Sequence, residues 1–460
     1  MRPPIHLEHL GGLDAFTCAR TLSHLPDLLF LDSARHHPGL GRSSFVAADP
    51  FGRFVVQDGR ALWNGDPLPQ PPLSALRSLL DRYRQSRVDR LPPFQGGAAG
   101  YLAYDFRHTL ERLTPAPVDV SCPEAVLPFY DVVVSFDHRS GDAWLISTGW
   151  PEQDPDRRQK RAAARARYFR RLLGHAPRPL RDCDLVSPWT SNFSASGYGE
   201  AVTAVIDSIL AGDIFQANIA QRFTARVSNE FDALAFYDRL RHVNPATFGA
   251  FLAFGETTIA SSSPERFVKV DRGDVETRPI KGTAARSSEQ RRDQNLAEVL
   301  LRSEKDRAEN LMIVDLLRND LSRVCKPHTV LTPVLCGLES YAAVHHLVSV
   351  VEGQLDSGFT ATDVMAACFP GGSITGAPKI RAMEIITQIE RCARQVYCGS
   401  IGYFGFDGTT DTNIAIRTVM LKDRSAVFHA GGGITALSEP RAEYEETLTK
   451  AQRIFAAFEA

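Results

Sequence analysis

Pro279-Ile280-Lys281-Gly282-Thr283 places a lysine in a chain that otherwise relies on arginine. Only eight of the 52 basic residues are lysines. A desolvated amine can lose its proton and act as a nucleophile, whereas a guanidinium stays charged. The competing interpretation is a solvated lysine in a turn, since lysine is mostly exposed in proteins. Whether Lys281 is a nucleophile or a solvated lysine depends on which other functional residues the chain places near it.

Length and composition are those of an ordinary globular protein. The chain has 460 residues, of which 43% are hydrophobic and 23% charged, and its net charge is −2. This charge gives no indication of nucleic-acid binding. The N-terminal residues lack the apolar stretch of a signal peptide, and no run reaches transmembrane length. Eight scattered cysteines form no C-x-x-C or metal spacing. We therefore expect a cytoplasmic protein with reduced thiols and neither a membrane nor a nucleic-acid partner.

The chain divides into three regions by pattern. Residues 1–150 mix strands and helices, with hairpins predicted across 57–60 and 138–142. Residues 151–190 hold an Arg- and Ala-rich helix, predicted to be exposed, and a Pro-containing linker, and the main boundary is placed there. Residues 191–460 carry the candidate functional groups.

Glu265 and Lys281 lie sixteen residues apart across a predicted hairpin, so both can face one cleft. A carboxylic acid and an amine can share acid/base and nucleophilic work. An ordinary salt bridge is the alternative.

Two carboxylate couples occupy predicted helices. Asp306 and Glu309 are spaced i, i+3 on one helix face, and Glu443 and Glu446 repeat this spacing on the last helix. Two helices that each present two carboxylates suit Mg²⁺, which requires oxygen ligands. Exposed helical acids are the alternative for either couple.

Two further segments could bind anions. The loop from Pro370 to Lys379, which contains Thr375, is glycine-rich and opens a helix, although it lacks the Walker order. A structural turn is the alternative. The segment Asp411–Met420 is predicted as one strand that places Arg417 on its mixed face, near the glycine run at 431–433. An arginine beside free backbone N–H groups is a plausible carboxylate receptor, and a surface charge is the alternative. Together these parts indicate a dianionic substrate without identifying it.

A series of motifs follows in order between about Phe193 and Phe458. They are residues 212–218, 263–267, 278–283, 306–316, 318–320, 344–349, 370–379, 398–403 and 431–434. Through these motifs the sequence resembles the chorismate-utilising enzymes, the family that includes anthranilate synthase component I. The N-terminal part matches more loosely, through Leu31-Asp32-Ser33 and residues 96–101.

The resemblance implies an α+β fold in which two large antiparallel sheets face each other in a sandwich-like core, with helices outside. Both regions contribute strands in that fold. Regions 1–150 and 191–460 are therefore expected to intertwine in one core rather than to form separate domains.

Lys281 discriminates within the family. Anthranilate synthases carry alanine at the equivalent position, add ammonia to the ring and eliminate pyruvate. The resemblance implies that Lys281 attacks C2 of chorismate and displaces the C4 hydroxyl, after which ammonia adds at C4 and expels the lysine. The product would be 4-amino-4-deoxychorismate, a precursor of para-aminobenzoate and folate. Isochorismate and salicylate synthases use a lysine base at or near Gln216, so glutamine there argues against water addition. An anthranilate synthase component I or an isochorismate-type enzyme is the alternative.

The resemblance also implies roles for individual residues. Lys281 would be the nucleophile and Glu265 the acid/base at the C4 oxygen, with His346 near the leaving group. The expected metal ligands for Mg²⁺ are Glu309 and Glu446 directly, and Asp306 and Glu443 through water or outer contacts. The expected substrate-binding residues are Gly282, Thr283, Thr375, Arg417, Gly432 and Gly433. Ser33 would belong to a possible regulatory pocket.

No cysteine lies in a G-x-C-x-G nucleophile elbow, so glutaminase activity is not expected in this chain. A separate glutamine amidotransferase subunit is the expected source of ammonia, with free ammonia as an alternative. A non-catalytic protein that binds chorismate or an aromatic amino acid is a further alternative.

Overall fold

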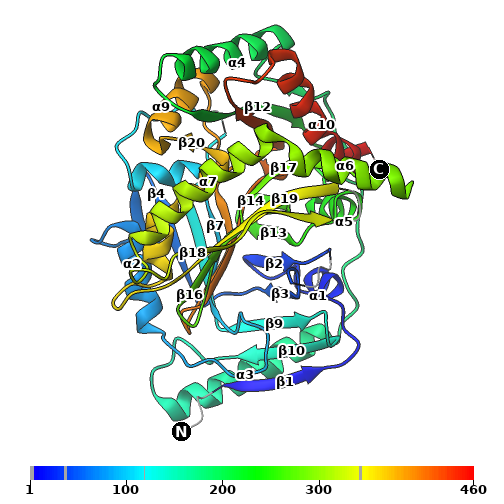
Figure 1. Ribbon diagram of the computed structural model, residues 1–460. Coiled ribbons are helices and arrows are strands. Elements are labelled where there is room, and N and C mark those ends of the chain that lie inside the picture. Colours follow the sequence, from blue (N-terminus) through cyan, green and yellow to red (C-terminus); the bar gives the residue numbers. More distant parts are fainter. Residues whose placement is uncertain (1–4, 36–38, 119, 341–343, 460) are drawn as a thin grey trace.

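The computed structural model describes residues 5–35, 39–118, 120–340 and 344–459. Two sheets of twelve strands each form the centre of this described part, and neighbouring strands pair antiparallel (Figure 1). In these ranges we find no helix whose length and apolar character would let it cross a membrane.

The first sheet contains most of the strands on the right of Figure 1. Its order in space is β1 (His6–Leu10), β10 (Asp142–Ser147), β9 (Val132–Asp137), β3 (Ser43–Ala47), β2 (Leu28–Asp32), β13 (Phe248–Phe254), β14 (Thr257–Ser263), β23 (Thr418–Lys422), β24 (Ser425–Ile434), β12 (Gln216–Arg226) and β11 (Thr190–Ser191), and β20 (Gly376–Ala377) also pairs with β12.

The second sheet begins at the strand that carries Lys281. Its order is β17 (Ile280–Ala285), β19 (Val344–Gln354), β16 (Asp274–Thr277), β15 (Arg266–Asp271), β22 (Thr410–Ile414), β21 (Ser400–Gly405), β7 (Gly97–Leu102), β8 (Ala125–Tyr130), β4 (Gly52–Gln57), β5 (Arg60–Trp63) and β6 (Asp66–Pro67), and β18 (Leu331–Ser340) also pairs with β19.

The two sheets face each other across a shared apolar layer. Phe45 of the first sheet contacts Tyr403 of the second at a ring-centroid distance of 5.7 Å, and Leu29, Leu252 and Tyr101 are buried in the same cluster. Because side chains of both sheets fill this layer, the expected α+β arrangement of two facing antiparallel sheets is confirmed.

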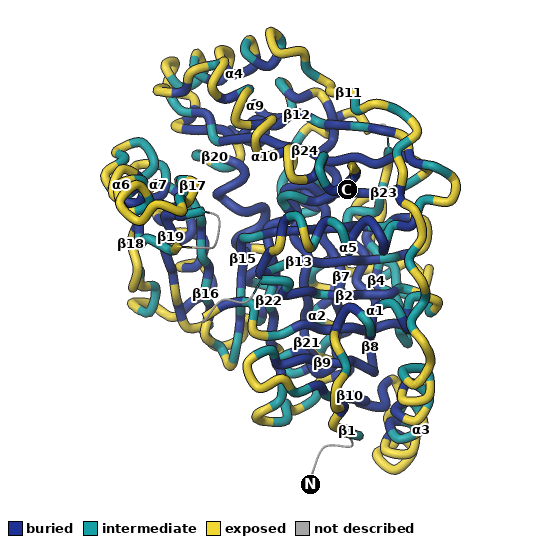
Figure 2. Tube along the Cα trace, turned by 90° about the vertical axis from the view of Figure 1, so that its right-hand side faces the viewer, coloured by how far each residue is buried: buried dark blue, intermediate teal, exposed yellow. Residues whose placement is uncertain are grey.

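Helices cover the outer faces of both sheets. On the first sheet lie α1 (Ala15–Leu22), α3 (Pro155–Leu173), α5 (Ala233–Val243) and α10 (Pro440–Glu459), and on the second α2 (Pro72–Arg82), α6 (Gln290–Arg302), α7 (Glu304–Ser322) and α8 (Ala361–Cys368). Helices α4 (Ala195–Leu210) and α9 (Lys379–Glu390) pack on β12. The short 3₁₀ helices are η1 (Tyr104–Thr109) and η2 (Gly372–Ile374). Figure 2 shows buried residues along the strands and exposed residues on the outer turns of α3, α4 and α6.

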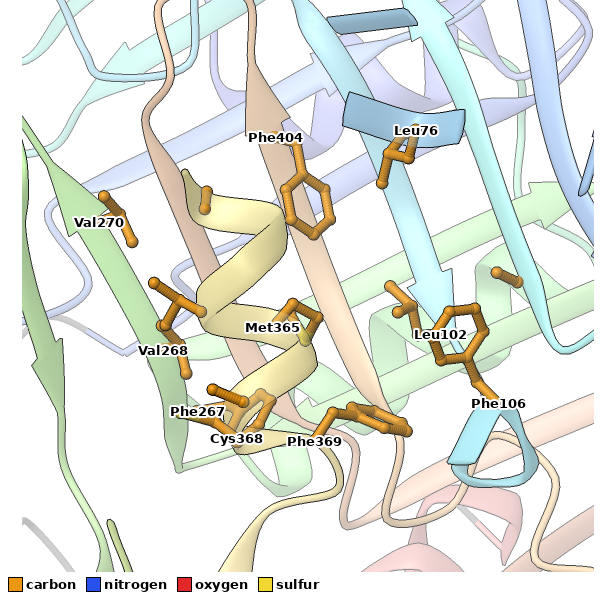
Figure 3. Close-up of a cluster of buried hydrophobic side chains, with 14 of the residues drawn as sticks. Leu76, Leu102, Phe106, Phe267, Val268, Val270, Met365, Cys368, Phe369 and Phe404 are labelled. Atoms are coloured by element: carbon orange, nitrogen blue, oxygen red, sulfur yellow. The ribbon is translucent and has the colours of Figure 1, made fainter. Parts of the chain in front are cut away.

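A second apolar cluster joins α8 to the second sheet (Figure 3). Met365 of α8 lies among side chains that include Phe404 and Leu102. Phe369, the residue after α8, contacts Phe106 and Phe267 at ring-centroid distances of 5.8 and 6.2 Å. This packing anchors the start of the glycine-rich loop at 370–378.

Both regions of the sequence contribute to both sheets. Residues before 150 supply one end of each sheet, and the joins are the antiparallel pairs β2–β13 and β7–β21. The helix expected to be exposed, α3, buries Ala162, Ala166 and Phe169. After it, Arg178 pairs with Asp232 at 2.7 Å. The segment 151–190 is thus packed on the protein, and α3 is exposed on only one side.

The expectation of one strand from Asp411 to Met420 is wrong. Strand β22 ends at Ile414 in the second sheet, and β23 begins at Thr418 in the first. Between them the chain crosses from one sheet to the other, and Arg417 has a φ of 50°. Apolar alternation continues through the crossing, so the pattern could not reveal it.

Candidate active site

Two crossings between the sheets run side by side and carry two of the candidate residues. Glu265 lies between β14 and β15, and Arg417 between β22 and β23. The Ile414 N–H donates to the Glu265 carbonyl (3.1 Å), and the Ser262 N–H donates to the Arg417 carbonyl (3.0 Å). The Ser263 hydroxyl donates to the Ile414 carbonyl (2.6 Å). These bonds fix Glu265 and Arg417 relative to each other where the sheets meet.

Ser373 of η2 brings Glu265 and Lys281 together. The Ser373 hydroxyl donates to Glu265 Oε1 at 2.8 Å, and Lys281 Nζ donates to the Ser373 carbonyl at 3.1 Å. Glu265 is 5% exposed, and the Lys281 side chain is 10% exposed. Lys281 Nζ also lies 3.9 Å from Glu309 Oε2. The amine and the carboxyl therefore share one enclosed site.

Burial changes the proton affinities of both groups. It raises the pKa of the Glu265 carboxyl to about 7, although the Ser373 hydroxyl and the Lys281 charge act in the opposite direction. It lowers the pKa of Lys281, with Glu309 and Glu265 opposing this shift. A carboxyl with a pKa near neutrality can give and take protons, and an amine with a lowered pKa is closer to its nucleophilic form.

His346 and Thr283 face each other on neighbouring strands. The Thr283 hydroxyl is hydrogen-bonded to His346 Nδ1 at 2.9 Å, and the two residues are register partners on β17 and β19. Burial, with a contribution from the Arg417 charge, lowers the pKa of His346 to about 4. The imidazole is therefore neutral at physiological pH. Gly282 has a φ of +72°, and a Cβ there would lie 3.0 Å from Asp306, so glycine is required at this irregularity within β17, where the register with β19 shifts.

The glycine run of β24 passes directly beside Lys281. A Cβ at Gly433 would lie 2.1 Å from Gln216 Nε2 and 3.3 Å from Lys281 Nζ. The Gln216 and Asn218 side-chain oxygens are buried and have no hydrogen-bond partner among the described residues. A side chain at Gly433 would fill this part of the site.

Arg417 provides a positive charge close to Glu265, whose charge favours the ionised guanidinium. Within the described residues no carboxylate forms an ion pair with this guanidinium. Burial, with contributions from Arg453 and Arg35, lowers its pKa to about 10, so Arg417 stays charged at neutral pH. An unpaired guanidinium suits an anionic group of a ligand.

The four predicted metal ligands lie on α7 and α10, and lysines neutralise three of them. The pairs are Lys281 with Glu309 (3.9 Å), Lys305 with Glu443 (3.4 Å) and Lys450 with Glu446 (2.6 Å). Burial raises the pKa of Glu309, whereas for Glu446 the ion pair with Lys450 more than offsets burial, and its pKa is lowered. No three acidic, histidine or cysteine side chains of the described ranges converge closely enough to form a metal site as they stand.

The donor set nevertheless fits Mg²⁺. Its oxygens are all carboxylate oxygens. A Cβ at Gly432 would lie 3.2 Å from Glu443 Oε2 and 3.6 Å from Glu446 Oε1, so both carboxylates border the glycine run. The charges of Glu309 and Glu446 both act on Lys281. The two helices thus present carboxylates around one region beside Lys281.

Two of the predicted ligand-binding residues, Thr375 and Ser33, have hydroxyl groups that are hydrogen-bonded within the protein. Thr375 is 1% exposed, and its hydroxyl donates to the Gly371 carbonyl at 3.0 Å. Ser33 follows β2, and its hydroxyl donates to the carbonyls of Ser43 (2.8 Å) and Thr247 (3.2 Å). Both hydroxyls are engaged within the protein, and the ligand roles of Thr375 and Ser33 stay predictions.

The sequence interpretation did not single out Ser373, Lys305 or Lys450. Ser373 lies within the glycine-rich loop 370–379 that was predicted to bind anions, but no role was predicted for it. The scarcity of lysine, used for Lys281, could also have pointed to Lys305 and Lys450, because three of the eight lysines meet at this site.

Comparison with known proteins assigns the chain. Residues 29–456 match the family model described as chorismate binding enzyme. The chain is 40% identical over 450 residues to aminodeoxychorismate synthase component 1 of Escherichia coli K12, covering 95% of this chain and 94% of the relative. It is 37% identical over 395 residues to anthranilate synthase component 1 of Aquifex aeolicus, covering 84% and 79%. The crystal structure of anthranilate synthase component I from Streptococcus pneumoniae matches with a TM-score of 0.79 at 33% identity, covering 91% of this chain and 93% of that one. The chain belongs to the chorismate binding enzyme family.

Proposed function

We propose that this chain converts chorismate and ammonia into 4-amino-4-deoxychorismate, on the route to para-aminobenzoate and folate. The observation that carries the proposal is Lys281, a buried amine with a lowered pKa held beside Glu265. The 40% identity to the E. coli aminodeoxychorismate synthase component 1 over nearly the whole of both chains supports the same reaction.

The first half of the reaction forms a bond to Lys281. The neutral amine attacks C2 of chorismate, both ring double bonds shift by one position toward C4, and the C4–oxygen bond breaks. Glu265 gives its proton to the departing oxygen, which leaves as water. The Glu265 carboxylate then accepts the proton released by the lysine nitrogen, which suits a carboxyl whose pKa is about 7.

The second half releases the product. Ammonia attacks C4, both ring double bonds shift back, the bond between C2 and the lysine nitrogen breaks, and Glu265 returns its proton to that nitrogen. The carboxylate finally takes a proton from the new ammonium group, which restores both residues. Arg417 and the backbone at Gly432 and Gly433 hold a carboxylate of the substrate throughout, and His346 borders the leaving group.

Glu309 and Glu446 would hold Mg²⁺, with Asp306 and Glu443 supporting it. When bound, the ion supplies stabilisation of the charge that develops on the ring carboxylate. Lys305 and Lys450 neutralise the same carboxylates, so the carboxylates would exchange these partners for the ion.

Ammonia would come from a separate glutamine amidotransferase. The E. coli relative is named component 1 of its synthase, which indicates a second component. Purified chain mixed with such a subunit should aminate chorismate with glutamine, and a complete lack of glutamine-dependent product with candidate subunits would contradict this partner.

The test is a product assay with chorismate, Mg²⁺ and ammonium for wild type, Lys281→Ala and Lys281→Arg. Lys326→Ala is the matched control, because Lys326 is an exposed lysine that bonds to Gln354. We expect 4-amino-4-deoxychorismate from wild type and control, and at least a 100-fold loss in both Lys281 variants. Release of anthranilate and pyruvate by the wild type would instead identify an anthranilate synthase, as in the A. aeolicus relative.

A further inference from the structure

One residue of η2 contacts both proposed catalytic side chains. The Ser373 carbonyl accepts from Lys281 Nζ at 3.1 Å, and the Ser373 hydroxyl donates to Glu265 Oε1 at 2.8 Å. Lys281 is on β17, and Glu265 follows β14. The position of Ser373 therefore sets how these two groups lie relative to each other.

Buried interactions hold the turn that carries Ser373. Arg394 Nη1 donates to the Ile374 carbonyl at 2.9 Å, and Arg394 Nη2 donates to the Asn218 carbonyl at 2.6 Å. Arg394 is paired with Glu390 at 2.6 Å, and both side chains are 1% exposed. The Asn218 N–H donates to the Thr375 carbonyl at 2.7 Å. A planar guanidinium can satisfy two carbonyls and a carboxylate at once, which an ammonium group cannot do in this geometry.

Packing leaves the turn little freedom to shift. A Cβ at Gly372 would lie 2.6 Å from Leu316 of α7, and a Cβ at Gly371 would lie 2.6 Å from Ile414. The turn is thus held between α7 and the end of β22, in addition to its bonds to Arg394 and Asn218.

We propose that Ser373 is a positioning residue for the amination: it fixes the Glu265 carboxyl and the Lys281 amine in their reactive arrangement, and the buried Arg394–Glu390 pair holds Ser373 in place. This inference rests on the proposed function.

Loss of this hydroxyl has a measurable consequence at Glu265. The groups that act on the carboxyl are the Ser373 hydroxyl, the charges of Lys281 and Arg417, and the Ile280 N–H, all of which favour its ionised form against burial. Removing one donor raises the pKa of Glu265. In the dependence of kcat on pH, the transition caused by ionisation of Glu265 should therefore move to higher pH.

The experiment compares Ser373→Ala with Ser135→Ala by steady-state amination across pH 5.5–9. Ser135 is a matched control, because it lies on β9, far along the first sheet, and its buried hydroxyl donates to the Phe94 carbonyl. For Ser373→Ala we expect kcat to fall about 10- to 100-fold and KM for chorismate to stay within about threefold. The apparent pKa that the pH profile of kcat assigns to Glu265 should move to a higher value. Ser135→Ala should match wild type in all three quantities.

A second variant tests the support of the turn without touching either catalytic contact. Arg394→Lys keeps the buried charge opposite Glu390 and loses the bond to the Ile374 carbonyl. We expect kcat to fall with little change in KM, and methyl acetimidate to modify Lys281, mapped by mass spectrometry, several times faster than in wild type. The faster labelling follows because Lys281 loses the carbonyl that holds it.

The outcomes separate this inference from the proposed function. The role of Ser373 would be overturned if Ser373→Ala left kcat and its pH dependence unchanged. It would also be overturned if Ser135→Ala lowered kcat as much as Ser373→Ala does. If the wild type makes no 4-amino-4-deoxychorismate, the proposed function fails, and the labelling rate still decides: equal labelling of Lys281 in wild type and Arg394→Lys overturns the positioning role.

Discussion

At Glu265 the protein keeps a carboxyl group in a place where its charge is unfavourable. The residue is 5% exposed, and burial raises the pKa of its carboxyl to about 7 from an ordinary value of 4.5. The folded state therefore keeps a proton between pH 4.5 and 7 that the unfolded state has already lost. Stability contributed at this position is present below pH 4.5 and is lost as pH rises through 7.

We therefore predict that Glu265→Gln stabilises the protein at alkaline pH. Glutamine is uncharged, so the variant should resemble wild type below pH 5 and exceed it above pH 7. The interval of about 2.5 pH units corresponds to on the order of 3 kcal/mol. Thermal unfolding at pH 5 and pH 8 measures the difference, while amination activity should fall about 100-fold or more in the variant.

Glu256→Gln serves as the control for this prediction, because Glu256 is exposed in the turn between β13 and β14. Its Tm difference from wild type should be the same at both pH values. A Glu265→Gln protein that gains no stability between pH 5 and pH 8 would show that the carboxyl ionises as freely in the fold as in water.

At this scale the sequence pointed to the two candidate catalytic residues but not to the residue that joins them. Lys281 was singled out by its rarity, and Glu265 by its place across a hairpin. Ser373 carries no such signal, since a serine in a glycine-rich loop is common. Its importance comes from hydrogen bonds to groups 108 and 92 residues away, which only the folded chain brings together.

Among the elements, α7 and α10 together form the metal-binding candidate. We predict that Mg²⁺ stabilises the wild-type chain against thermal unfolding, because an ion that binds only the folded state contributes about 2.7 kcal/mol at a hundredfold excess over Kd. Glu309→Gln and Glu446→Gln should each remove most of this effect. Titration calorimetry with Mg²⁺ measures the same loss without any substrate.

The matched control on α10 is Glu445→Gln, since Glu445 is 61% exposed and pairs with Arg441 on the outer face. This variant should bind Mg²⁺ as wild type does. Equal Mg²⁺ binding by wild type, Glu309→Gln and Glu446→Gln would exclude these two helices as the metal site.

Local signals predicted two hairpins correctly and failed at one crossing. The hairpins β4–β5 and β9–β10 form where turn residues indicated them, and helix α4 begins after Ser194, whose hydroxyl accepts from the Gly197 N–H at 3.1 Å. These features depend on neighbours in sequence. The break at Arg417 depends on which sheet each half of the segment joins, and alternation within the segment contains no information on that choice.

For the whole molecule, the two-sheet arrangement came from family resemblance, because strand order in sheets of this size depends on pairings between distant segments. The division near residues 151–190 follows a real change in composition. Yet the strands on either side of it are joined through β2–β13 and β7–β21.

We predict that the chain cannot be divided there into folded halves. Fragments 1–180 and 181–460 would expose the edges of β2, β7, β13 and β21, so each alone should be unfolded or aggregated by circular dichroism and gel filtration. The intact chain should unfold in a single transition. A soluble fragment 1–180 with native-like thermal unfolding would show that the N-terminal region is an independent domain.

The paired crossings at Glu265 and Arg417 also bear on how such a protein can change during evolution. Because the site is assembled from both sheets at their junction, recombination cannot transplant it as a module into another scaffold, and no exchanged segment brings the whole site with it. New chemistry on this scaffold has to arise by replacing single side chains within an intact chain. The two relatives with different names, each aligned over more than three quarters of its length, fit that history, and Lys281 is the position where we expect one such replacement to have separated them.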